Sequence, residues 1–278
     1  MASQTYYEVL TAAISDLVEH GFDSVERIAR WELKIAEAAR ASLRSPSELD
    51  AALRASLSAI YKRLAEQGQL AKYHRGVSKF TLERVRPELR KILDQRIMAS
   101  ANLIRLNRDQ AIQKTLQRFS GWATSIPAGG SKAADKAEEK ASIKKPLARL
   151  KFEERRVLID QGHKLSGAIN QTVAEGGGAI ALIWHSNWRQ VGYNYREDHK
   201  DRDLHVYALK GSWAFEKGLA KPGPDGWYES ITAVASEPFC RCHAEYLYSL
   251  RDLPEAMLTV KGKESLEEAR RKIREEMA

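Results

Sequence analysis

The sequence predicts an α+β protein, in which a helical N-terminal half with long amphipathic helices precedes a small mixed α/β C-terminal domain. In the first half, apolar residues recur at the three- and four-residue spacing of helices with one buried face. After the three glycines at 176–178 the pattern changes to short apolar runs separated by turn residues, which is typical of strands. At 278 residues, the chain is long enough for two domains.

Three helices open the chain. Residues 6–20 carry an apolar stripe, and Gly21 follows as a stop signal. Asp-Ser-Val-Glu at residues 23–26 predicts a capping box at the start of a second helix. Ser-Pro-Ser-Glu at residues 45–48 is a stronger start signal for a third helix, which we expect to end at Gly68.

The remainder of the helical region, residues 1–126, contains two further elements. Residues 70–82 have near-alternating apolar positions around a central glycine, which predicts a short hairpin. A long amphipathic helix is expected from Pro87 to about Trp122. Residues 127–150 are polar, of low complexity and rich in Lys and Ala, so they are expected to form a linker.

The C-terminal domain is expected to span residues 151–254. It begins with a helix over 152–174, and the apolar run at 179–184 predicts a buried strand. Further strands are expected at residues 205–209, 227–232 and 240–248. A charged helix is expected to close the chain over residues 255–278.

The charge balance favours polyanionic partners. Lys and Arg number 45 against 37 Asp and Glu, which gives a net charge of +8 at pH 7. The basic residues are interleaved with Glu along the helices, as at 267–276, and this pattern is more typical of a solvated helix face. No apolar run approaches the roughly 20 residues of a membrane span, and the first residues lack the layout of a secretion signal. We therefore expect no membrane contact and a protein that stays in the cytoplasm where it is made.

The two cysteines of the chain, Cys240 and Cys242, stand two positions apart. In an extended strand both thiols would point to the same face and could meet at one ion. Thiolate and imidazole are common zinc ligands. The ligand set expected for zinc is His199, His205, Cys240 and Cys242, with His185 and His243 as substitutes. A second interpretation, in which the thiols are packed small hydrophobes and the histidines form hydrogen bonds within the fold, stays open.

Two other functions are compatible with the sequence. His199, Asp201, Asp203 and His205 form a cluster that could hold a catalytic cation for phosphodiester cleavage, although no unique general base emerges. Residues 1–86 have the outline of a winged-helix DNA reader, with three helices followed by a basic hairpin. No glycine-rich phosphate loop is present. We therefore expect a structural protein without catalytic residues.

Two segments resemble a known family. The arrangement Arg196-x-x-His199-x-x-x-Asp203-x-x-x-Tyr207, followed by Cys240-Arg-Cys242, resembles the C-terminal domain of the phage Mu F-like minor head proteins, a family of tailed-phage head morphogenesis factors. The resemblance covers roughly residues 152–254.

Two positions depart from the family pattern. Phe239 stands where Asn commonly precedes the first cysteine, and Leu204 stands where Gly often follows the aspartate.

The resemblance implies a structural protein of the virion, in the head interior or at the portal vertex, that is made in the host cytoplasm. Its implied partners are the portal protein, the major capsid protein and packaged double-stranded DNA. The resemblance also marks the fold-organising residues of the motif as Arg196, Asp203, Tyr207 and Arg241. Copy number and homo-oligomerisation stay open.

Overall fold

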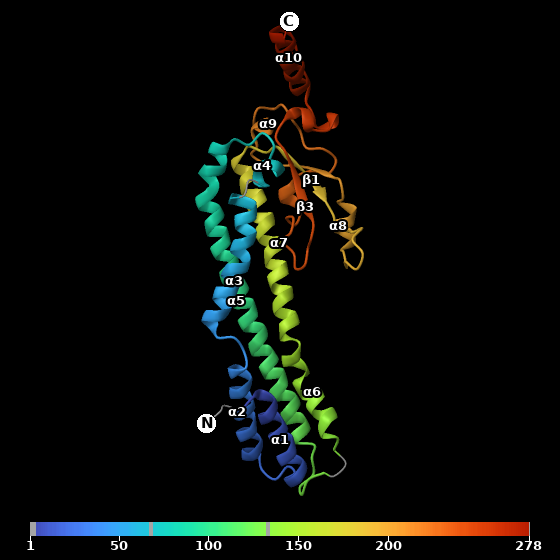
Figure 1. Cartoon of the computed structure of the whole chain (residues 1–278). Helices are drawn as coiled ribbons and strands as arrows, with labels where there is room; N and C mark the ends of the chain where they lie inside the picture. The colour runs from blue at the N-terminus through green and yellow to red at the C-terminus, as the bar shows by residue number, and fades with distance from the viewer. Residues whose placement is uncertain (1–3, 67–68, 132–133, 278) are drawn as a thin grey trace. The chain divides into compact units, whose positions relative to one another are not determined.

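The chain was analysed as a computed structural model, which describes residues 4–66, 69–131 and 134–277 (Figure 1). The fold is α+β as predicted, because long helices are combined with one small antiparallel sheet in the C-terminal region. The expected end of the third helix at Gly68 lies outside the described residues.

The chain forms two compact units, and each is built from two separate segments. The first combines Met1–Arg54 with Met98–Leu158, and the second combines Ala55–Ile97 with Ile159–Ala278. This division differs from the predicted one, because residues before the expected linker belong to the second unit.

The helices described are α1 (Tyr6–His20), α2 (Val25–Ala41), α3 (Pro46–Tyr61), α4 (Gln69–Tyr73), α5 (Lys79–Ala123), α6 (Lys136–Ala148), α7 (Leu150–Gly176), α8 (Glu197–Asp201), α9 (Trp213–Glu216) and α10 (Val260–Met277). The strands are β1 (Ala181–His185), β2 (Val206–Ala208) and β3 (His243–Leu247). A π-helical turn follows α3 at Lys62–Glu66, and short 3-10 helices lie at Tyr228–Ser230, Leu250–Asp252 and Glu255–Met257.

The first three helices confirm the sequence signals. Helix α1 has the predicted bounds. Helix α3 begins at the predicted start signal, where Ser45 Oγ accepts from the Glu48 amide at 3.3 Å and Glu48 Oε2 accepts from the Ser45 amide at 2.8 Å. The capping box expected at residues 23–26 was wrong, because α2 is capped one residue later by Ser24, whose side chain accepts from the Arg27 amide. Each start therefore uses a hydroxyl oxygen to satisfy an otherwise free amide.

The core of the first unit is formed by α1, α2, α6 and the C-terminal part of α5. Their buried members include Leu10, Leu17, Ile35, Phe119 and Ile143. Ile143 belongs to the segment that the sequence predicts to be a linker. That prediction was wrong for its second half, because Asp135 caps α6 by accepting from the amides of residues 137 and 138, and Ile143 supplies a buried contact.

The predicted hairpin at residues 70–82 was also wrong. These residues form most of α4, a turn at Gly76 and the start of α5. Gly76 has φ of 93°, which favours glycine and reverses the chain after α4. Ser78 Oγ then accepts from the Thr81 amide at 3.1 Å and begins α5, so the helix starts upstream of Pro87 and contains it. The winged-helix interpretation required a β-hairpin at residues 70–82, and the structure has helices and a turn there.

The sheet of the second unit has the strand order β2-β1-β3, and both neighbours run antiparallel to β1. Leu182 at the centre of β1 pairs with Tyr207 on one side and Tyr246 on the other. These residues are buried and pack with Trp184 and the cysteines in one apolar cluster. The sheet is therefore the platform from which the loops before β3 and after β1 extend.

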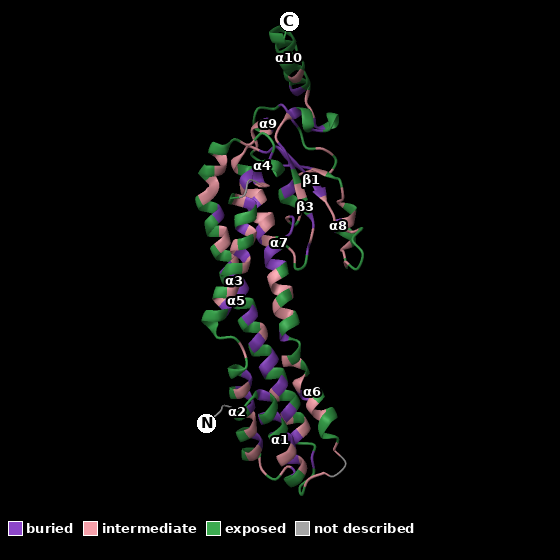
Figure 2. Cartoon of the chain, in the orientation of Figure 1, coloured by how far each residue is buried: buried purple, intermediate pink, exposed green. Residues whose placement is uncertain are grey.

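Two strand predictions need correction. Residues 227–232 contain a single bridge between Trp227 and Ala208 followed by the 3-10 helix Tyr228–Ser230. Strand β3 begins only at His243, so both cysteines precede it. The predicted charged C-terminal helix is found as α10, which is exposed along most of its length (Figure 2). Among the described helices, none is long and apolar enough to cross a bilayer.

A buried histidine joins three segments of the second unit. His74 follows α4 and is 1% exposed. Its Nδ1 accepts a hydrogen bond from the Tyr248 hydroxyl, with 2.5 Å between the two atoms. Its Nε2 lies 3.0 Å from Asn170 Oδ1 in α7, and Asn170 in turn donates to the Ser166 carbonyl. Because the amide oxygen only accepts, Nε2 carries the proton and the ring is neutral. Burial accordingly lowers the pKa of His74 below 6.5.

We expect the His74 contact to make the protein less stable in mild acid. The folded pKa lies below the unfolded value, so the stability is fully present above pH 6.5 and is lost as pH falls below it through the folded pKa. Urea unfolding between pH 7.5 and pH 5 should show a steeper loss of unfolding free energy in the native chain than in His74→Gln. Equal slopes in the two proteins would contradict this assignment.

Candidate metal centre

Three candidate ligands converge in the second unit. His199 lies in α8, whereas Cys240 and Cys242 lie in the loop before β3. The Nδ1 atom of His199 is 3.5 Å from Sγ of each cysteine, and the three donor atoms all lie within 4.8 Å of one another. The exposed fractions are 1% for His199, 1% for Cys240 and 5% for Cys242. This buried His/Cys/Cys group can hold a metal ion.

The cysteines meet the histidine through a loop turn, and not through the strand geometry expected from the sequence. The Cys240 amide donates to the Glu237 carbonyl at 3.2 Å, which closes a tight turn. Within this turn Phe239 has φ of 62°, and its amide donates to Asp160 Oδ1 on α7 at 2.5 Å. The buried Asp160 carboxylate therefore fixes the loop to the helix beneath it.

One thiol and two backbone amides donate hydrogen bonds to the Cys240 sulfur. The pKa of the Cys240 thiol is lowered to about 5, chiefly because the Cys242 thiol donates a hydrogen bond to it, and also because the backbone amides of Cys242 and Ala235 point at the sulfur. The pKa of Cys242 is raised, because this thiol holds the shared proton and is buried. The pair thus carries one thiolate readily, and thiolate is the form that binds metals.

The other side of the His199 ring faces a carboxylate. Nε2 lies 3.2 Å from Glu237 Oε2, and the edge of the ring packs against the face of the buried Trp184 with centroids 5.3 Å apart. The Nε2 and Oε2 atoms do not meet the geometry of a hydrogen bond, since both are buried without a hydrogen-bond partner among the described residues. A carboxylate beside the far nitrogen is the usual partner of a metal-binding imidazole. Packing against Trp184 leaves the ring with Nδ1 toward the two sulfurs.

Arg196 connects the two motif segments. Its Nε lies 2.9 Å from Glu237 Oε2, and its Nη2 donates to the Pro238 carbonyl at 3.0 Å. Because Arg196 immediately precedes α8 and His199 lies within that helix, one turn places both side chains against the cysteine loop. This geometry gives the Arg-x-x-His spacing a physical reason.

Asp203 organises the turn after β1. Its Oδ1 accepts from the Ser186 amide at 2.8 Å, and its Oδ2 accepts from Trp188 Nε1 at 2.9 Å. Burial alone would raise the pKa of Asp203, but these two hydrogen bonds and the charges of Arg189 and His185 outweigh it and lower the pKa. Both carboxylate oxygens are thus engaged in holding the fold.

The structure places His205 apart from the three convergent ligands. Its Nδ1 lies 3.0 Å from Asp225 Oδ1, and its side chain is half exposed. The substitutes are engaged elsewhere as well, because His185 and His243 stack on each other across β1 and β3 with centroids 4.9 Å apart. The geometry therefore reduces the predicted four-residue set to three ligands.

The remaining motif residues also have structural contacts. Tyr207 is buried in β2, where burial raises its pKa. The backbone of Arg241 is fixed twice, because its amide donates to the Tyr193 hydroxyl at 3.1 Å and its carbonyl accepts from Asn187 Nδ2 at 2.7 Å. The suggested nuclease cluster is dispersed, since His199 faces the sulfurs, Asp203 faces the Ser186 turn and His205 faces Asp225.

Both departures from the family pattern fall at left-handed backbone positions. Leu204 has φ of 68° and Phe239 has φ of 62°, and both side chains are exposed. Glycine adopts this conformation freely, and asparagine tolerates it better than most residues. The family's Gly and Asn thus match the backbone of this chain better than its own residues do.

We expect Leu204→Gly to raise the unfolding free energy by roughly 0.5–1 kcal/mol, because it removes left-handed strain at an exposed site. Phe239→Asn should act in the same direction. Leu204→Ala is the matched control, since it removes the exposed side chain but keeps a Cβ at the same φ. Urea denaturation of the three variants would contradict the strain argument if Leu204→Ala stabilised the protein as much as Leu204→Gly.

Sequence reasoning missed three residues that support the centre: Asp160, Trp184 and Glu237. Glu237 had a usable signal, because it lies three residues before Cys240 and such a spacing can close a turn. Asp160 had no signal, since only the folded chain brings α7 to the cysteine loop.

The chain was compared with known proteins in three ways. No family model, no curated protein and no solved structure matches it.

Proposed function

We propose that this chain is a structural minor head protein of a tailed bacteriophage, which acts in head assembly beside the portal or the major capsid protein. The observation that carries the proposal is the convergence of His199, Cys240 and Cys242. These ligands come from the two segments on which the resemblance to the Mu F-like proteins depends. A metal ion bound to these three residues would link α8 to the loop before β3.

The contacts of the motif support a structural role. Arg196 holds the cysteine loop, Asp203 holds the turn after β1, and Tyr207 fills the core beside β1. A catalytic carboxylate needs a free oxygen that faces its substrate. Asp203, the aspartate of the motif, has both oxygens occupied by protein donors.

The ion proposed for the centre is zinc. Two thiolates and one imidazole match its preference for sulfur and nitrogen donors, and the carboxylate beside His199 Nε2 matches the environment of zinc-bound histidines. When bound, zinc would supply a cross-link between α8 and the cysteine loop. The ion takes four ligands in structural sites, so a fourth position stays available to water or another donor.

The net charge supports a contact with packaged DNA as part of the same proposal. Lys and Arg side chains that approach phosphates release condensed counterions, so such a contact weakens steeply as salt increases.

The proposal is tested by purifying the affinity-tagged full chain from cells producing phage particles. We expect portal or major capsid subunits to be enriched with the native chain, and to be reduced with Cys240→Ser. Recovery of the native chain without any head protein, together with its absence from purified particles, would contradict the role in the head.

Plasmid cleavage tests the alternative function, a metal-dependent nuclease. A metal-dependent nuclease would cut plasmid DNA with magnesium or manganese and would lose this activity in His199→Ala. We expect no cleavage by the native chain.

A further inference from the structure

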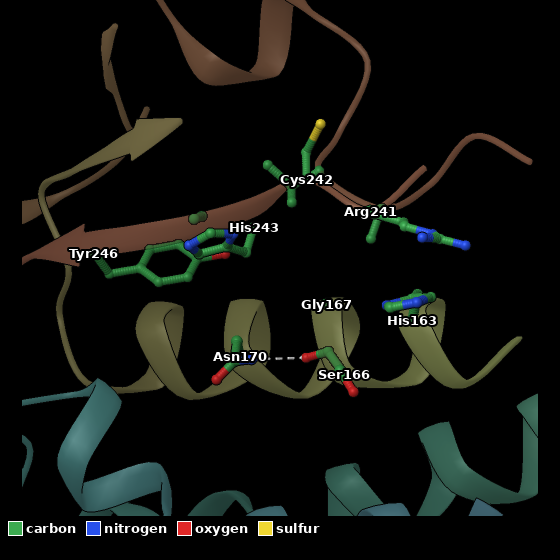
Figure 3. Close-up of a pocket in the computed structure, with 11 residues that line it drawn as sticks. His163, Ser166, Gly167, Asn170, Arg241, Cys242, His243 and Tyr246 are labelled. Atoms are coloured by element: carbon green, nitrogen blue, oxygen red, sulfur yellow. Dashed lines mark hydrogen bonds between the residues drawn. The ribbon is translucent and has the colours of Figure 1, made fainter. Parts of the chain in front are cut away.

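A small pocket lies between α7 and β3. Its cavity volume is about 100 Å³, enough for a few waters or one small ion. In Figure 3, α7 forms one wall of the pocket. Strand β3 and the residues just before it form the opposite wall. The polar groups that line it are His163, Ser166, Asn170, Arg241, His243 and Tyr246.

Two of these groups form the basic end of the pocket, where Arg241 carries the positive charge. In Figure 3 the Arg241 guanidinium lies over the His163 ring. The pKa of His163 is lowered, first by burial and then by the positive charge of Arg241, while the nearby Asp160 and Cys240 act in the opposite direction. The guanidinium also lies 5.0 Å from the centroid of the Tyr193 ring, which limits its freedom to turn away.

The nearby carboxylates have other partners. Asp160 receives the Phe239 amide on Oδ1 and Lys164 on Oδ2, and Glu237 lies between Arg196 and His199. Within the described ranges of the chain, Arg241 has no Asp or Glu oxygen at ion-pair distance, although it is half buried. None of its nitrogens is among the buried atoms without a partner, so the guanidinium stays accessible to a ligand in the pocket.

The Cys242 sulfur does not face the pocket. Figure 3 shows the Cys242 sulfur pointing away from α7, so it lies on the far side of the backbone from the pocket. If the zinc proposed above is bound, two thiolates and a neutral imidazole already balance its charge of +2. The Ser166 hydroxyl and the Asn170 amide nitrogen donate to the carbonyls of residues 162 and 166, so these hydrogens are already used within α7.

We propose that this pocket binds one oxyanion group, a carboxylate or a phosphate, between Arg241 and His163. The guanidinium presents parallel N–H donors that match two oxygens of such a group, and His163 adds one further N–H. Its cavity admits a single group and not a nucleic-acid backbone. The oxyanion comes either from a free or nucleotide-borne phosphate, or from an acidic side chain of a partner protein.

The test is calorimetric titration of the zinc-loaded full chain at constant ionic strength, with inorganic phosphate in one arm and N-acetylaspartate amide in the other. We expect saturable binding of one equivalent in at least one arm. Tighter binding of phosphate identifies the first source, and tighter binding of the aspartate analogue identifies the second. Absence of saturation in both arms would overturn the proposal.

Variants separate this pocket from the metal centre. We expect Arg241→Gln to weaken binding by at least about tenfold, Arg241→Lys to weaken it less because one point charge is kept, and the exposed control Arg251→Gln to leave it unchanged. The metal content should stay the same in all three. Unchanged affinity in Arg241→Gln, or loss of zinc from it, would overturn the proposal. A native chain that takes up no zinc but still binds the anion would contradict only the zinc site.

Discussion

We expect His199→Ala to abolish metal binding by this chain, and His205→Ala to leave the metal content unchanged. The two histidines lie six positions apart in one motif, yet only His199 has a ring nitrogen near both sulfurs, at 3.5 Å from each. The His205 ring is paired with Asp225 instead. Elemental analysis of the two purified variants beside the native protein measures the difference directly.

The same loss should appear in the stability of the second unit. A ligand that binds only the folded state at a thousand times its dissociation constant stabilises that state by about 4 kcal/mol. His199→Ala and Cys240→Ser should both lose this contribution, because a serine hydroxyl does not ionise as a thiol does. Thermal unfolding with and without a chelator should therefore separate the native protein from these variants, which the chelator should not affect further.

Two results would contradict this account of the ligands. Equal loss of metal from His205→Ala and His199→Ala would restore the four-residue set expected from the sequence. Full metal content in His199→Ala would show that the ion does not use this ring.

Trp184→Ala should destabilise the protein by roughly 3–5 kcal/mol, because it removes a large, fully buried side chain and leaves a cavity. Trp184 lies in β1 opposite Ala244 and packs against the His199 ring. The substitution should therefore also weaken metal binding, since the imidazole loses the surface that orients it. Urea denaturation and a zinc titration measure the two effects.

Trp184→Phe is the matched control, because it keeps most of the apolar volume in the same place. We expect a smaller loss of stability and a zinc affinity close to that of the native protein. A loss below about 1 kcal/mol in Trp184→Ala would be incompatible with the burial of this residue.

Local signals predicted the elements that depend on few neighbours. The apolar stripe of residues 6–20 gave the bounds of α1, and the Ser-Pro-Ser-Glu start signal at residues 45–48 gave the start of α3. The apolar run after the glycines at 176–178 predicted β1, since a short continuous run is typical of a buried strand.

The failures arose where tertiary contacts override local pattern. Residues 70–82 alternate like a hairpin, but burial of His74 against Tyr248 and Asn170 fixes them as a helix end and a turn. The polar linker contains α6, because one apolar residue, Ile143, reaches the core of the first unit and Asp135 supplies a cap. The composition of this segment predicts neither the burial of Ile143 nor the cap formed by Asp135.

The candidate site was predictable in its residue types and only partly in its membership. Cys240, Cys242 and His199 could be selected because thiols and imidazoles suit one ion. The exclusion of His205 depends on the end of α8 and the pairing of β2, which turn its ring toward Asp225. The sequence alone does not specify that orientation.

X-ray absorption spectroscopy of the zinc-loaded native protein tests the central claim most directly, because it reports the atoms bound to the ion. We expect one zinc per chain with two sulfur neighbours at about 2.3 Å and at least one nitrogen neighbour at about 2.0 Å. A shell made only of oxygen and nitrogen, or protein that takes up no zinc, would contradict the assignment of His199, Cys240 and Cys242 as the ligands.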